Sequence, residues 1–61
     1  SGNVFAIAGA VMQVLMKAGR FDLAGEFAQN WMKQRHYKDV LAYARQFVEL
    51  IAMDADEGES A

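Results

Sequence analysis

The stretch that decides the fold is VFAIAGAVMQVLM, residues 4–16, in which Gln13 is the only polar side chain. At 13 residues it falls short of the roughly 20 that a bilayer span needs. Ser-Gly-Asn precedes it and Lys-Ala-Gly-Arg follows, so it lacks the basic residue before the apolar run and the cleavage site after it that a secretory signal needs. We therefore predict a buried helix in a cytoplasmic protein, with no membrane partner.

Residues on either side of this stretch predict where the helix begins and ends. Asn3 is a good N-cap, because its side-chain oxygen can accept hydrogen bonds from the free amides of the first turn. Lys17 suits the negative end of the helix dipole, and Gly19 stands where a left-handed residue commonly ends a helix. The first helix is thus expected over about residues 4–18.

Two further helices follow from apolar residues that recur at spacings of three and four. One is expected at about 23–34, capped by Asp22, with the stripe Leu23, Ala24, Phe27, Ala28, Trp31 and Met32. The other is expected at about 37–53, with the stripe Val40, Leu41, Ala44, Phe47, Val48 and Ile51. No alternation typical of strands is present. The fold class is therefore all-α, a compact three-helix bundle over residues 1–53.

Charge is distributed unevenly along the chain. Residues 1–53 carry six cations and four acids, while residues 54–61 carry the other four acids and no cation. Four carboxylates at a helix C-terminus oppose the macrodipole. We therefore expect residues 54–61 to form a disordered acidic tail.

The helix at 4–18 is apolar nearly all round, and such a helix needs burial on more than one side. The helix at 37–53 also has a second apolar line through Tyr43, Phe47 and Leu50. Both features favour a homodimer over the alternative, a monomer with the first helix at its centre. The expected dimer or partner surface comprises Ala6, Gly9, Ala10, Met12, Met16, Tyr43 and Leu50.

The composition excludes several kinds of chemistry. The chain has no cysteine and no threonine, and its two serines are Ser1 and Ser60, so disulfides, thiolate metal sites and interior Ser, Thr or Cys nucleophiles are excluded. His36 is the single imidazole and is interpreted as a surface residue. We predict no catalytic residue, no metal site and no cofactor, and therefore no enzyme.

A basic cluster offers an alternative function. Lys33, Arg35 and Lys38 surround the connector between the second and third helices, and Arg45 follows. Several positive donors on one surface suffice for phosphate contact, so nucleic-acid binding is the second hypothesis. The aromatic and methionine side chains are expected mainly in the core: Phe5, Met12, Met16, Phe27, Trp31, Met32 and Phe47.

The order of several short motifs resembles a family of small uncharacterised proteins from bacterial mobile elements. The motifs are Gly2-Asn3-Val4-Phe5-x-Ile7-x-Gly9, Leu15-x-x-x-Gly19, Ala24-x-x-Phe27, Tyr37-x-x-Val40-Leu41 and Phe47-Val48-Glu49-Leu50. The resemblance covers about residues 2–51 and implies a compact helical protein without an established activity. It carries over no catalytic or ligand residue.

Taken together, these patterns predict a small non-enzymatic interaction or regulatory module that self-associates through apolar helix surfaces. The expected partners are a second copy of the chain and an unidentified protein.

Overall fold

The computed structural model describes the backbone of residues 3–60 and the side chains of residues 3–55. The described chain forms α1 (Val4–Lys17), α2 (Phe21–Asn30), the short 3₁₀ helix η1 (Trp31–Lys33) and α3 (Tyr37–Ser60). Residues 3–60 contain no strand. The prediction of an all-α fold with three main helices is therefore confirmed.

Both predicted ends of α1 are confirmed by their hydrogen bonds. The side-chain oxygen of Asn3 accepts from the backbone N–H of Phe5 at 3.0 Å and of Ala6 at 3.2 Å. At the other end Gly19 has a φ of +74°, and its N–H donates to the Met16 carbonyl at 3.0 Å. The Arg20 N–H donates to the Leu15 carbonyl at 2.9 Å, which completes a Schellman motif.

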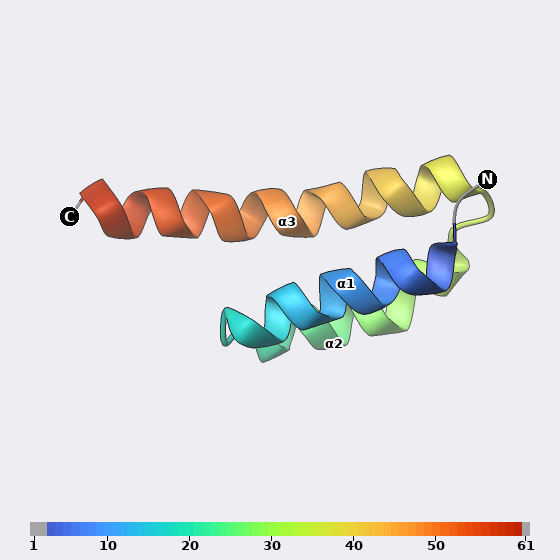
Figure 1. Ribbon diagram of the computed structural model, residues 1–61, viewed down its shortest axis with the longest axis horizontal. Coiled ribbons are helices and arrows are strands. Elements are labelled where there is room, and N and C mark those ends of the chain that lie inside the picture. Colours follow the sequence, from blue (N-terminus) through green and yellow to red (C-terminus); the bar gives the residue numbers. More distant parts are fainter. Residues whose placement is uncertain (1–2, 61) are drawn as a thin grey trace.

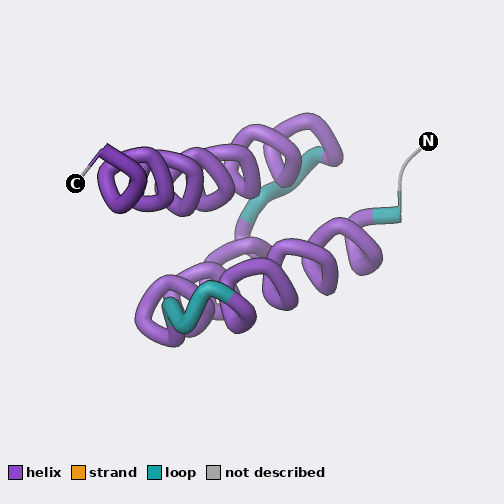
Figure 2. Tube along the Cα trace, turned by 60° about the vertical axis from the view of Figure 1, so that its left-hand side comes forward, coloured by secondary structure: helices purple, strands orange, loops and turns teal. Residues whose placement is uncertain are grey.

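The Gly19 turn folds α1 and α2 into an antiparallel hairpin, and α3 then returns alongside it in the same direction as α1 (Figures 1 and 2). Helix α1 packs against both of the others, whereas α2 and α3 contact each other less. The end of α3 projects beyond the Gly19 turn, so the molecule measures 40 × 18 × 15 Å (Figure 1).

The core lies where the three helices converge. Its buried residues are Ala8, Val11, Leu15, Ala24, Phe27, Val40, Ala44 and Phe47. Phe27 is fully buried, with Tyr43 stacked on it at 5.6 Å and Phe47 edge-on at 5.3 Å between ring centroids. Burying such rings supplies much of the apolar contact in so small a core.

The last helix differs from the one expected at 37–53. It continues through the acidic segment to Ser60, so the helix boundary near residue 53 is not observed and the disordered acidic tail is not confirmed. Ala52, Met53 and Ala55 favour this continuation, because alanine and methionine are strong helix formers. Two members of its expected stripe, Leu41 and Val48, remain 39% and 43% exposed.

The second helix also differs in detail. It begins at Phe21, so Asp22 lies within the first turn and Arg20 occupies the N-cap position that was assigned to Asp22. It ends at Asn30, after which Trp31–Lys33 tighten into η1. The Asn30 side chain donates to the Glu26 carbonyl, one turn earlier in the chain, at 2.7 Å.

Candidate interaction surfaces

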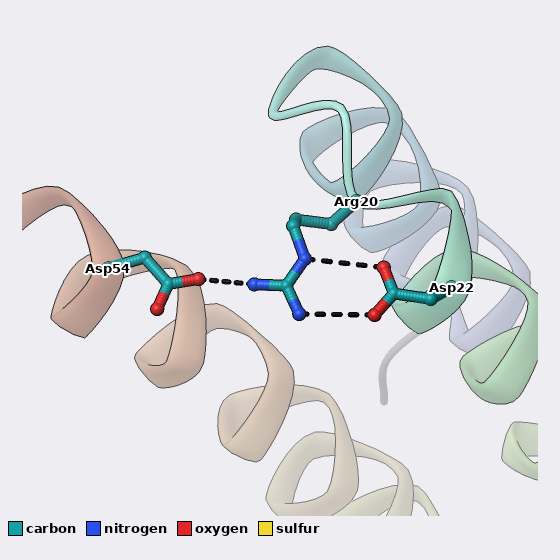
Figure 3. A network of polar contacts seen from close by, with 3 residues as sticks. All are labelled: Arg20, Asp22 and Asp54. Atoms are coloured by element: carbon teal, nitrogen blue, oxygen red, sulfur yellow. Dashed lines mark hydrogen bonds and ion pairs between the residues drawn. The ribbon is translucent and has the colours of Figure 1, made fainter.

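The end of the molecule that contains the Gly19 turn is joined by a polar network around Arg20 (Figure 3). Its guanidinium donates from Nε and Nη2 to the two carboxylate oxygens of Asp22, at 3.2 and 3.1 Å. Its Nη1 pairs with Asp54 of α3. These bonds raise the pKa of Arg20, and the Arg20 hydrogen bond lowers the pKa of Asp22. The network ties the hairpin turn to α3.

The small residues predicted for a dimer surface lie on the exposed side of α1. Ala6, Gly9 and Ala10 are all exposed, and a Cβ atom added at Gly9 would meet nothing within 4 Å. No contact within the described chain therefore requires glycine at this position. Of the two methionines, Met12 is half-buried against the core, whereas Met16 is exposed, so the assignment of Met16 to the core was wrong.

The residues of the predicted apolar line on α3 lie in two different environments. Tyr43 is half-buried and stacks on Phe27, and this burial raises the pKa of its phenol, with the charge of Glu26 adding to the effect. Tyr43 therefore packs in the core, which leaves little of it for a partner. Leu50 is exposed, as the prediction of a partner surface requires.

A cleft opens at the opposite end of the molecule, between the start of α1, η1 and the connector to α3. It has a volume of about 290 Å³, and its lining is Val4, Phe5, Trp31, Met32, Gln34, Arg35, His36, Tyr37 and Val40. Phe5 meets Trp31 edge-on at 5.6 Å. Phe5 and Met32 are each 71% exposed, so their assignment to the core was wrong.

The predicted nucleic-acid contacts divide between this cleft and the middle of α3. Arg35 lines the cleft, and Lys33 and Lys38 are exposed close to it in sequence, on η1 and on the first turn of α3. Arg45 is exposed two turns further along α3. Within residues 3–55, Arg20 is the one cation that forms ion pairs. Lys33, Arg35 and Lys38 therefore pair with no acid of that part of the chain.

A stripe of apolar side chains leads along α3 from the cleft toward its other end. Tyr37, Leu41, Val48 and Ala52 follow one another at spacings of four, seven and four, which places them on one side of the helix. All four are exposed. We refer to these four residues as the outer α3 stripe.

The described residues contain no group of three or more His, Cys, Asp and Glu side chains placed to hold a metal ion. None of the described helices combines the length and apolar character needed to cross a membrane.

Comparison of the chain with protein-family models, curated proteins and solved structures finds no match. The resemblance to mobile-element proteins therefore stays a prediction.

Proposed function

We propose that this protein is a small non-enzymatic interaction or regulatory module that self-associates through apolar helix surfaces. One observation carries the proposal. Among the described side chains, five large apolar residues are buried, whereas ten are exposed: Phe5, Val14, Met16, Phe21, Met32, Tyr37, Leu41, Val48, Leu50 and Met53.

This excess has a physical consequence. Removing apolar surface from water is favourable by about 25 cal/mol per Å². A domain near 60 residues buries only about 60% of the surface that its unfolded chain exposes, so its stability is marginal, and oligomerisation is one of the few ways to supplement its core. Disulfides are unavailable to a chain without cysteine. A second copy supplies the missing apolar contact at several of these positions at once.

The solution mass tests self-association. Light scattering at tens of micromolar should give about twice the chain mass of 6.8 kDa. Exposed apolar positions such as Met16 and Leu50 were predicted to lie on the association surface. Met16→Glu and Leu50→Glu test these two positions, and Leu41→Glu and Val48→Glu test two further exposed apolar positions of α3. At least one of these pairs should lower the mass, whereas Gln13→Glu, at an exposed polar position of α1, should change it less. A folded wild-type chain that stays at 6.8 kDa would contradict the proposal.

The family resemblance adds a host protein as a second class of partner. A pull-down from the host cell with the wild-type chain and Leu50→Glu as paired baits is the matching experiment. Specific capture by the wild type alone is the expected result, because Leu50 is exposed and its change spares the core. Equal capture by both baits would exclude Leu50 from the partner surface.

Nucleic-acid binding is the second candidate function, because the cleft places aromatic rings beside a cationic connector. Trp31 and Tyr37 offer surfaces on which bases can stack, and Arg35 offers a phosphate donor in the same cleft. Binding of this kind weakens steeply with salt. It should also weaken when Lys33, Arg35 and Lys38 are changed to Ala. Absence of binding to an oligonucleotide at low salt would remove this candidate.

A further inference from the structure

The two ends of α3 carry opposite charges. Lys33, Arg35 and Lys38 lie before or within its first turn, and the last eight residues of the chain hold four acids and no cation. Glu57 follows Tyr37 by 20 positions, so the two charged ends are separated by about 30 Å of helix. Each end is therefore out of reach of the other within one copy.

These charges also oppose the helix dipole. Cations at the N-terminal end and carboxylates at the C-terminal end are both unfavourable next to the partial charges of the helix. Asp39 is the acid in the first turn, and the last turn has no basic residue to offset its acids. A binding partner with an oppositely charged group at each end would offset this unfavourable electrostatic interaction.

The outer α3 stripe connects the two ends with apolar surface. Tyr37 belongs both to the cleft and to the stripe, and Ala52 lies near the acidic end. Leu41 and Val48, between them, stay exposed because the hairpin covers another side of α3. A partner lying along this stripe would thus reach from the cleft to the acidic segment.

We infer that two copies pair through their outer α3 stripes in antiparallel orientation, with the acidic end of each α3 against the basic, aromatic cleft of the other. This inference rests on the proposed self-association and specifies its geometry. An antiparallel pair is isologous, so the same charge contact forms twice. Ala52 and Ala55 are small and exposed, which lets the partner helix approach the rings of Phe5 and Trp31 closely.

A charge-swap experiment in the full chain tests the pairing. One variant combines Lys33→Glu, Arg35→Glu and Lys38→Glu, and the other combines Asp56→Lys, Glu57→Lys and Glu59→Lys. Asp54 is left unchanged because it pairs with Arg20. Each variant alone should associate at least about tenfold more weakly than the wild type, since both contacts become repulsive. An equimolar mixture should regain wild-type association, because both contacts become attractive again.

The single tryptophan gives an independent readout, because Trp31 lines the cleft. Its emission should shift to the blue when the wild type associates and when the variants are mixed, and stay unchanged when each variant is diluted alone. Association of the wild type should also weaken between about 0.05 M and about 0.5 M NaCl. Circular dichroism checks that the variants remain helical, and the salt series retains the test if one does not fold.

Each outcome decides a different point. Dimers that persist in both variants and at high salt would overturn the antiparallel pairing and leave the proposed self-association standing. A wild type that is monomeric throughout would overturn both. If a thymidine oligonucleotide shifts Trp31 emission while the mass stays that of a monomer, the cleft is a nucleic-acid site and the pairing is wrong.

Discussion

Each end of this molecule has cationic side chains, but in the described part of the chain those at one end form ion pairs and those at the other end do not. At the Gly19 turn, Arg20 bonds Asp22 and Asp54, and the backbone N–H groups of Gly19 and Arg20 are satisfied by α1 carbonyls. At the connector, Lys33 and Arg35 pair with no acid within residues 3–55, and they adjoin an open aromatic cleft. One end satisfies its polar groups internally and the other leaves them available.

The difference separates residues that hold the fold from residues that are free to bind. A charged side chain whose donors are already used contributes to connecting the helices, as Arg20 does between the turn and α3 (Figure 3). A cation beside exposed rings has its donors available for a partner. Changes at the Gly19 end should therefore alter stability, whereas changes at the connector end should alter association.

The largest expected contrast compares Leu15→Ala with Phe5→Ala. The Leu15 side chain is fully buried in the core, so its truncation removes apolar contacts and leaves a cavity, which should cost about 2–5 kcal/mol of unfolding free energy. Phe5 is largely exposed at the cleft, so its truncation should cost less than half as much. Urea unfolding of the dilute chain measures both, and equal losses would contradict the distinction.

The stability of the chain should change with opposite signs when Gly19 and Gly9 are each replaced by alanine. Gly19 has a positive φ, where a Cβ is strained, so Gly19→Ala should cost about 1–2 kcal/mol. Gly9 lies within α1 with open space around it, so Gly9→Ala should stabilise the isolated chain by up to about 1 kcal/mol. Thermal unfolding at low concentration measures both.

In concentrated solution the same Gly9→Ala variant tests whether the small exposed residues of α1, Ala6, Gly9 and Ala10, lie in the interface between two copies. Stabilisation that disappears as the concentration rises would show a partner helix packed closely against this face. The antiparallel pairing through α3 predicts that the stabilisation persists at all concentrations.

A smaller contrast compares two arginines. Arg20→Gln should lower Tm by an amount that shrinks as salt rises, because its ion pairs are exposed and screened. Arg35→Gln should leave the Tm of the dilute chain nearly unchanged and weaken association instead. Scanning calorimetry and light scattering separate the two effects, and a larger Tm loss for Arg35→Gln would reverse the assignment of the two ends.

The smallest expected effect concerns acid. The Arg20 hydrogen bond holds the pKa of Asp22 below the ordinary value of 3.8. Asp22 therefore contributes stability that is complete above that value and is lost as the pH falls through the lower pKa of the folded state. Asp22→Asn should flatten the part of the acid unfolding curve that lies below pH 3.8. An unchanged curve would show that the pairing of Asp22 with Arg20 does not contribute to stability in acid.

The sequence predicted what depends on local interactions. The cap at Asn3 and the turn at Gly19 are local signals, and both appear in the structure. The periodic stripes located the helices apart from shifts at their ends, although Met32, Leu41 and Val48 of those stripes are exposed. The Arg20–Asp54 pair was not predictable, because it joins residues 34 positions apart. The continuation of α3 past Asp54 was missed because the acidic charge was weighed above the helix propensity of its neighbours.

The surface was harder to predict than the helices. Phe5 is apolar, yet it lies to one side of the Ala8, Val11 and Leu15 stripe, and this spacing was the available sign that it would not be buried. The cleft itself depends on how η1 and the connector place Trp31 beside Phe5. No spacing within one helix reports that arrangement.

The most direct test of the antiparallel pairing uses the absence of cysteine. Ala61→Cys introduces a unique thiol for a nitroxide spin label, and the labelled chain is mixed with an isotope-labelled chain that carries no spin label. Antiparallel pairing predicts that the label broadens the amide signals of residues 33–38 and the Trp31 indole signal of the unlabelled copy. Broadening confined to the last turns of α3 in that copy, or no broadening at all, would contradict it.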